Sequence, residues 1–125
     1  MVPKGPMSVK ALSVIAPKTI TKKNQAITVA VRVKGLALDP THIGRKSLAR
    51  HGHMQIYLDR IPNAAYKQGN LADVVAIAAG PIFTFVLSPQ WKAKAHGRHT
   101  YLIALAQNNE VLYNVKAASF TLTVK

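Results

Sequence analysis

The chain has 125 residues, of which 17 are Lys or Arg, only 4 are Asp or Glu, and none is Cys. This length predicts one domain with an ordinary hydrophobic core, and the lack of cysteine excludes disulfide bonds, thiolate metal sites and a cysteine nucleophile. The formal net charge of +13 should attract polyanions, acidic lipid headgroups or acidic proteins. So few carboxylates also argue against the paired-acid chemistry of glycoside hydrolysis.

The expected organisation is a single domain over residues 8–125, preceded by residues 1–7 as a disordered or trimmed N-terminal segment. That segment contains two prolines and lacks the apolar region of a signal peptide, so we expect any export signal to have been removed. No apolar run reaches the roughly 18 residues of a transmembrane helix.

The first half of the chain shows the alternation of apolar and polar residues that is typical of strands. Residues 8–15 alternate loosely, residues 18–25 form a polar turn, and residues 27–34 alternate cleanly, with β-branched side chains on one face. A long basic loop is expected over residues 35–50, and a strand over residues 51–59.

The second half continues this pattern after the interruption at Pro62. Residues 71–79 fit either a strand or a short helix, and this element must end at Gly80-Pro81. Strands are expected over residues 82–87, 98–107 and 117–125, with a basic connection over residues 90–97. About seven strands without a long helix predict an all-β fold, an immunoglobulin-like antiparallel β-sandwich.

Three stretches resemble a bacterial family of exported or cell-surface immunoglobulin-like domains. They are Gly35–Pro40 followed by Ile43-Gly44, Gly52-His53 leading into Ile56-Tyr57-Leu58-Asp59, and Gly97-Arg98-His99-Thr100 leading into Asn108-Asn109. The resemblance implies a sandwich over residues 8–125 and a periplasmic or extracellular location, and the family's biochemical role is poorly defined. This chain has Gln55 where relatives tend to repeat a histidine, and Glu110-Val111 where they often have Asp-His, so two potential ligands are missing.

The strand that begins at His51 carries the strongest candidate ligands. On a strand, His51 and His53 share one face with Gln55 and Tyr57, whereas the opposite face, with Met54, Ile56 and Leu58, is the better core face. In this kind of sandwich the strands 51–59 and 98–107 are antiparallel neighbours, so His96 and His99 should lie at the far end.

The same pairing brings Glu110 beside His51 and His53. These three side chains would form a site open to water, of the two-histidine, one-carboxylate kind that zinc or copper accepts. In the alternative, the two imidazole rings hydrogen-bond the 35–50 loop and hold it against the sheet.

The remaining histidines are expected to be structural or exposed. We expect His99 to bond backbone groups of the preceding connection, and His42 and His96 to lie in solvent. Ser47 is near His51 in sequence, but no acid is expected to orient that ring. Because no nucleophile, phosphate-loop or zinc-protease motif occurs, we predict no enzymatic activity and no required cofactor.

The sequence therefore predicts a non-enzymatic exported binding or structural module of a bacterial cell envelope. Its binding end would be formed by the 35–50 loop, His51, His53 and residues 108–110. The candidate binding residues at this end are Arg45, Lys46, Arg50, Asn108 and Asn109. The alternatives are a periplasmic zinc- or copper-binding protein that uses His51 and His53, and a polyanion-binding module.

The expected partner is an envelope component or an acidic molecule. Sequence-specific nucleic-acid binding is not expected, because Trp91 is the only aromatic residue among the basic loops. An unpaired edge strand or the apolar 71–79 segment would support a homodimer, so both monomer and homodimer stay open.

Overall fold

The computed structural model describes residues 5–16, 19–20, 25–69 and 71–125 of the chain. The longer strands are β1 (Ser8–Ala16), β3 (Ala26–Lys34), β5 (His51–Leu58), β6 (Val74–Ala78), β7 (Ile82–Val86), β8 (Gly97–Gln107) and β9 (Ala118–Val124). The shorter elements are β2 (Thr19–Ile20), β4 (Ala37–Leu38), two 3-10 helices (Pro40–His42 and Asn63–Tyr66) and α1 (Pro89–Lys94). In the described part of the chain, no helix has the length and apolar character needed to cross a membrane.

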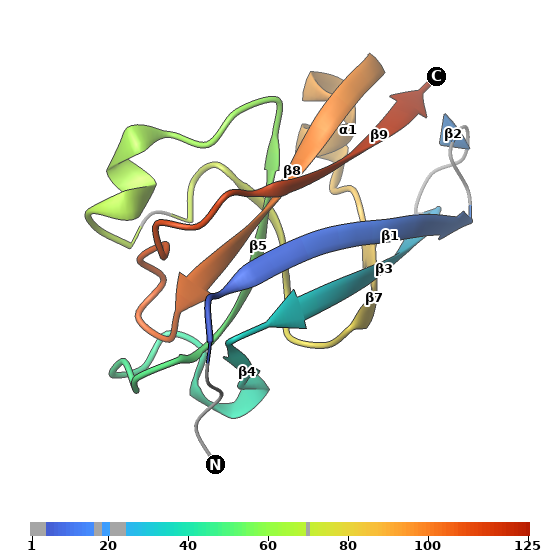
Figure 1. Ribbon diagram of the computed structural model, residues 1–125. Coiled ribbons are helices and arrows are strands. Elements are labelled where there is room, and N and C mark those ends of the chain that lie inside the picture. The colour runs from blue at the N-terminus through green and yellow to red at the C-terminus, as the bar shows by residue number, and fades with distance from the viewer. Residues whose placement is uncertain (1–4, 17–18, 21–24, 70) are drawn as a thin grey trace.

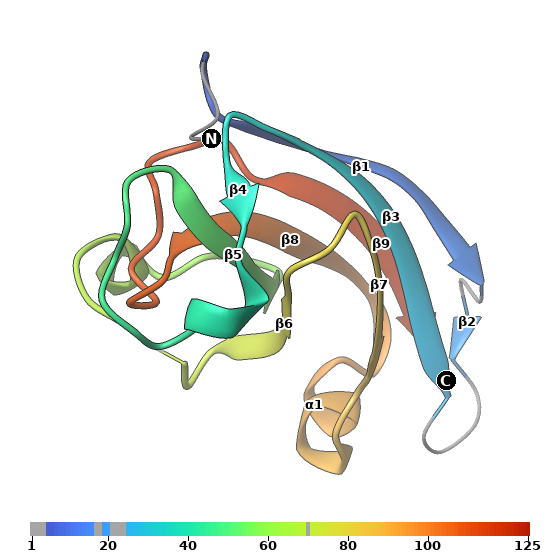
Figure 2. The same ribbon diagram turned by 90° about the horizontal axis from the view of Figure 1, so that it is seen from below.

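These strands form two sheets that pack face to face (Figures 1 and 2). One sheet has the order β1-β3-β7, and the other has the order β2-β9-β8-β5-β4, with β6 also paired to β5. Every pairing between the longer strands is antiparallel, and only the short β2 and β4 pair in parallel. This arrangement confirms the predicted immunoglobulin-like β-sandwich.

Several expected elements can be compared directly with the structure. The ambiguous segment 71–79 contains a strand, β6, and the predicted long loop 35–50 contains the short β4 and a 3-10 helix. The predicted turn over residues 18–25 lies largely outside the described residues. The expected antiparallel pairing of β5 with β8 is confirmed, since Gly52 is opposite Gln107 and Leu58 is opposite Tyr101.

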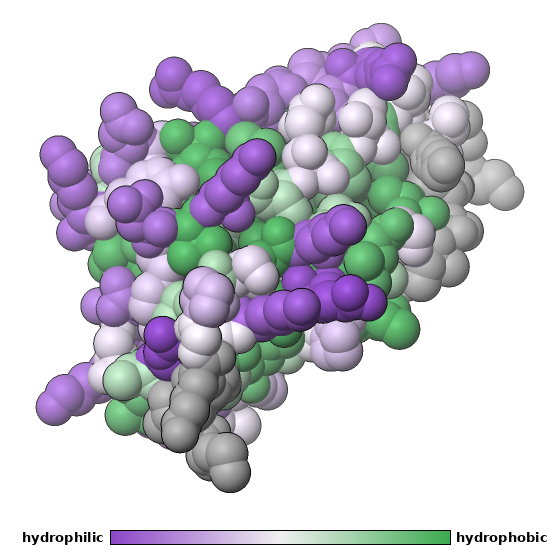
Figure 3. Space-filling model, viewed as in Figure 1, coloured by the Kyte–Doolittle hydropathy of each residue, from purple (hydrophilic) through white to green (hydrophobic). Residues whose placement is uncertain are grey.

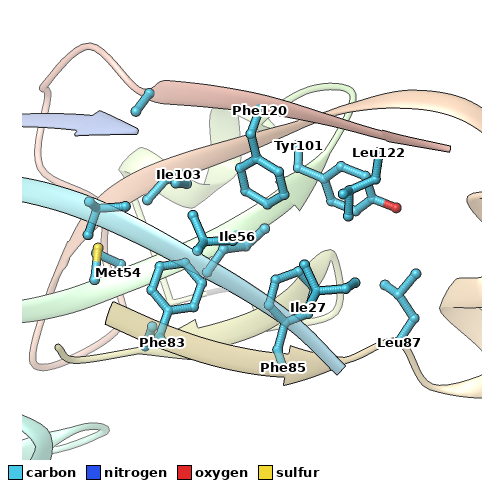
Figure 4. Close-up of a cluster of buried hydrophobic side chains, with 14 of the residues drawn as sticks. Ile27, Met54, Ile56, Phe83, Phe85, Leu87, Tyr101, Ile103, Phe120 and Leu122 are labelled. Atoms are coloured by element: carbon cyan, nitrogen blue, oxygen red, sulfur yellow. The ribbon is translucent and has the colours of Figure 1, made fainter. Parts of the chain in front are cut away.

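The core between the sheets is built from alternate residues of each strand (Figure 4). Ile27, Val29 and Val31 of β3 are buried, as their alternation predicts, and Phe83 and Phe85 of β7 join them. The facing sheet contributes Met54, Ile56, Tyr101, Ile103, Phe120 and Leu122. The rings of Phe85 and Phe120 meet edge to face across the two sheets, with their centroids 6.4 Å apart, a favourable arrangement for aromatic pairs.

The outer face of β5 and β8 is also covered. A second apolar cluster there contains Tyr57, Ala104 and Ala106 from the sheet, together with Ala65 and Leu112 from the loops that follow β5 and β8. The two loops are joined by a backbone hydrogen bond of 2.9 Å from the Leu112 amide to the Ala65 carbonyl. As a result β5 is buried on both of its faces, which places the polar residues of that strand in the interior.

Candidate functional site

His53 lies in a fully buried polar cluster on the covered face of β5. Its Nε2 is 3.3 Å from Glu110 Oε2, and Gln55 Nε2 donates a hydrogen bond to the same carboxylate oxygen. Tyr57 OH donates in turn to Gln55 Oε1 at 2.8 Å. Glu110 is thus the acceptor at the centre of the cluster, while the buried Nδ1 of His53 has no hydrogen-bond partner in the described structure.

The structure corrects the expectation that this site is open to water. His53 and Gln55 are completely inaccessible and Glu110 is only 8% exposed, because the loops that carry Ala65 and Leu112 cover them. The structure brings His53 and Glu110 together, as the topology predicts, but the ring of His51 turns to Asp39 instead. Among the described residues, no three His, Cys, Asp or Glu side chains are grouped so that they could hold a metal ion. Binding of zinc or copper by His51, His53 and Glu110 stays a prediction.

Burial determines the protonation of this cluster. Removal from water lowers the pKa of His53, and the neighbouring Glu110 carboxylate opposes that effect only in part. Burial likewise raises the pKa of Tyr57 to about 12, with smaller contributions from Tyr66, Asp73 and Glu110. At neutral pH, therefore, the interior holds a neutral imidazole and a neutral phenol beside Glu110.

Acidification is expected to destabilise the protein through His53. Because the pKa of His53 is lower in the folded state than in the unfolded chain, the unfolded chain binds the extra proton first as the pH falls below its pKa of about 6.5. The resulting loss in the free energy of unfolding is at most about 1.4 kcal/mol per pH unit from this group, and it fades as the pH rises above about 7.

Chemical denaturation of the parent and of His53→Gln between pH 7.5 and 5 measures this effect. The parent should lose stability more steeply with falling pH than His53→Gln, in which the other titrating groups are unchanged. Equal slopes for the two proteins would show that the buried imidazole does not control acid sensitivity.

Asp39 organises a second, exposed cluster at the start of β5. Its Oδ1 contacts His42 Nδ1 at 2.9 Å and accepts from Thr41 Oγ1 at 3.0 Å, and its Oδ2 is 3.2 Å from His51 Nδ1. These contacts, led by the hydrogen bond from His42, lower the pKa of Asp39 to about 2. His51 therefore bonds the 35–50 loop, as the alternative to a metal site predicts for this ring, whereas His53 contacts Glu110 and Gln55 and not that loop.

The Asp39 cluster also corrects the expectation that no acid orients the ring of His51. Asp39 occupies that position, twelve residues before the histidine in sequence. The Oγ of Ser47 is nevertheless buried without a hydrogen-bond partner, so the contact between serine and imidazole that a nucleophilic serine needs is not made in the described structure.

A third histidine–carboxylate pair joins β5 to β8 at the other end of these strands. His99 Nδ1 is 2.7 Å from Asp59 Oδ2, and His99 Nε2 is 3.0 Å from the carbonyl of His96. The bond to the preceding connection confirms the expectation for His99, whereas the pairing with Asp59 was not predicted. The expected pairing could have predicted this contact, because antiparallel pairing of β5 with β8 places the end of β5 beside the start of β8.

The residues of the predicted binding end have different environments. The loop is tied to the turn after β8, because the Gly44 amide donates to the Asn108 carbonyl at 2.6 Å and Asn108 Nδ2 donates to the Lys46 carbonyl at 3.5 Å. The guanidinium of Arg50 donates to the backbone carbonyls of Gly5 and Gly35, so it holds the loop and the N-terminal segment together. The exposed side chains of this set are Arg45, Lys46 and Asn109.

Cations also gather on the exposed face of the β1-β3-β7 sheet. Lys10 of β1 is directly opposite Arg32 of β3, and Lys34 lies two residues further along β3 on the same face. All three side chains are exposed, and we call this set the basic sheet face. Like charges directly opposite each other on a sheet are destabilising, so these positions cost the fold some stability.

Comparison with known proteins gives a structural likeness and no sequence match. No family model matches the chain, and no curated protein matches its sequence. A solved structure of fibronectin(III)-like modules of CbhA from Clostridium thermocellum is similar over 97% of this chain and 50% of that one, with 10% sequence identity and a TM-score of 0.39. This chain spans about half the length of that matched chain.

Proposed function

We propose that this protein is a non-enzymatic module that binds a polyanionic or acidic partner in a bacterial cell envelope. The observation that carries the proposal is the basic sheet face, where Lys10, Arg32 and Lys34 lie side by side on an exposed sheet surface. These like charges repel one another and attract an external anion. An anion bound at this face would reduce the repulsion between them.

The contacts made by the acidic side chains support this proposal. Asp39, Asp59 and Glu110 each face a histidine, and no ion pair seen among the described residues joins one of them to a Lys or Arg. With 17 basic side chains against 4 acidic ones, most of the basic side chains cannot be matched by a carboxylate of the chain. The unmatched positive charge can therefore attract a ligand, and added salt should weaken that attraction.

The proposed envelope location rests on the resemblance of three sequence stretches to exported immunoglobulin-like domains. The anionic polymers and lipid headgroups of an envelope have the charge that this surface requires. Binding of single-stranded nucleic acid is less well supported, because it uses exposed aromatic platforms. Trp91 is partly buried against the core, and Lys94 Nζ lies 5.0 Å from the centre of its ring.

Retention on heparin, as a model polyanion, tests the proposal with a matched pair of variants. Lys10→Glu/Lys34→Glu reverses two charges of the basic sheet face, and Arg45→Glu/Lys46→Glu reverses two exposed charges of the 35–50 loop with the same change in net charge. We expect the parent to elute at high salt and the sheet variant to elute earlier than the loop variant, because contacts with the anion set the salt dependence.

Stability gives a second readout for the same surface. Lys10→Glu alone converts the repulsive pair with Arg32 into an attractive one, so it should raise the free energy of unfolding by about 0.2–1 kcal/mol while weakening retention. Equal elution of the two double variants would mean that only total charge matters, and a parent that passes through at low salt would overturn the proposed function.

A further inference from the structure

Two strand edges without a strand partner face each other at the side of the sandwich. In the part of the chain that the structure describes, β1 pairs only with β3, and β9 pairs with β8 on one edge and with β2 only at Thr123 and Val124 on the other. Within the described residues, the stretch of β9 from Ala118 to Leu122 therefore has one edge that no strand covers. β1 and β9 lie side by side in the two sheets (Figures 1 and 2).

A groove of about 480 Å³ runs between these two edges. Its walls are residues 7–11 of the β1 edge and residues 115–119 leading into β9. Met7, Val9, Ala11 and Val115 are partly buried in its base and pack against the core. Figure 3 views this side of the molecule and shows hydrophobic side chains exposed between hydrophilic ones.

The charge of the groove has a single sign. Lys10 and Lys116 are the charged residues among those that line it, and both are exposed. Lys10 also belongs to the basic sheet face, so the groove is continuous with the surface to which we assign anion binding. None of the lining residues is aromatic, which disfavours stacking of nucleobases or sugar rings.

The free edges beside the groove suit one additional strand. Hydrogen bonds between neighbouring strands run within the plane of a sheet, at a strand spacing of about 4.8 Å. Because β1 and β9 already lie close to each other across the groove, an extended polypeptide there would continue one of the two sheets by pairing with the edge of β1 or with the edge of β9. Backbone N–H and C=O groups along such edges are matched by another polypeptide and not by a lipid headgroup or a polysaccharide.

The edge of β1 is regular only where it borders the groove. Its pairing with β3 runs without interruption from Ser8 to Ala11, and the two register shifts of the strand follow, between Ala11 and Ser13 and between Val14 and Ala16. Bulges of this kind protect exposed edges from further pairing. The unprotected part of β1 is thus the part that lines the groove.

We propose that this groove receives an extended acidic segment of a partner protein as an added β-strand. Alternate apolar side chains of that segment would face Val9 and Val115, and its acidic side chains would reach Lys10 and Lys116. The preference for an acidic partner rests on the proposed function, whereas strand addition rests on the two free edges and the groove between them.

The test uses a short peptide of alternating valine and aspartate and the same peptide with every second amide N-methylated. Both have the same charge, but the second cannot make the backbone hydrogen bonds of an added strand. We expect the first peptide to bind with amide chemical-shift changes centred on residues 8–11 and 117–119, and the N-methylated peptide to bind at least tenfold more weakly.

A matched pair of charge variants completes the experiment. Lys116→Glu, in the groove, should weaken binding of the unmodified peptide several-fold, whereas Lys67→Glu, in the exposed loop after β5, should leave it nearly unchanged. Folding of each variant is checked by the dispersion of its amide spectrum.

Strand addition is overturned if the two peptides bind equally well, or if the shifts map to residues outside the groove. The same holds if neither peptide binds while the protein is retained on heparin, a result that leaves the proposed function intact. Failure to bind both the peptides and heparin would overturn the strand addition and the proposed function together.

Discussion

Replacement of Glu110 by alanine is expected to lower the free energy of unfolding by about 2 kcal/mol, because it removes the acceptor that two buried nitrogens share and leaves them only each other as partners, and an unsatisfied buried donor costs about 1–3 kcal/mol. Those nitrogens are His53 Nε2 and Gln55 Nε2, which both contact Glu110 Oε2. Neither can turn to water, since His53 and Gln55 are completely buried.

Glu110→Gln provides the control for this prediction. The amide has the same size and retains one acceptor oxygen, so it should cost less than half as much as Glu110→Ala when both are compared by chemical denaturation. Residue 110 has a φ of +76° in the native chain, and the strain of that conformation is common to the two variants. A loss below about 1 kcal/mol in Glu110→Ala would mean that the cluster does not depend on its carboxylate.

Replacement of Gly52 by alanine is expected to be at least as damaging, with a loss of more than about 3 kcal/mol or no folded protein at all. A Cβ at this position would lie 1.8 Å from the carbonyl oxygen of Ala106 and 3.0 Å from its carbon. The obstructing atoms belong to the backbone of β8, so relief requires the two central strands of the sheet to separate.

Gly80→Ala is the matched control for Gly52→Ala. The nearest atom to a Cβ at Gly80 is the carbonyl oxygen of Ile82, at an ordinary contact distance of 3.7 Å. This variant should therefore change stability by no more than about 1 kcal/mol, mainly through the entropy of the unfolded chain. Thermal unfolding of both variants measures the contrast, and a stable Gly52→Ala would show that β5 and β8 are not as closely paired as the structure has them.

The fold could be predicted to a large extent because its information is local. The alternation of Ile27, Val29 and Val31 with polar residues identifies a half-buried strand, and the breaks at Gly80-Pro81 and Ser88-Pro89 separate the strands that follow. Within the described residues, seven strands of five or more residues in two packed sheets agree with the expected number. The pairing of β5 with β8 then placed Glu110 beside His53 correctly.

The environment of the candidate site was harder to predict, because it depends on segments far apart in the chain. In the sequence, His53 and Gln55 have the pattern of the exposed polar face of a strand. In the structure, the loops with Ala65 and Leu112 cover that face. One local signal existed, since Tyr101 to Ala106 of β8 is an unbroken apolar run, which is typical of a strand covered on both faces. The contact of Asp39 with His51 has no such signal, because it depends on the path of the intervening loop.

The double burial of β5 has a consequence for how this sequence can change over evolutionary time. In β1, β7 and β9 alternate side chains face outward, so about half of the positions can accept neutral substitutions. From Gly52 to Tyr57 every residue of β5 is buried, and each is constrained by the core or by the polar cluster. Substitutions should therefore accumulate on the outer strands while β5 drifts slowly, which makes residues 52–57 the best segment with which to detect distant relatives of this chain.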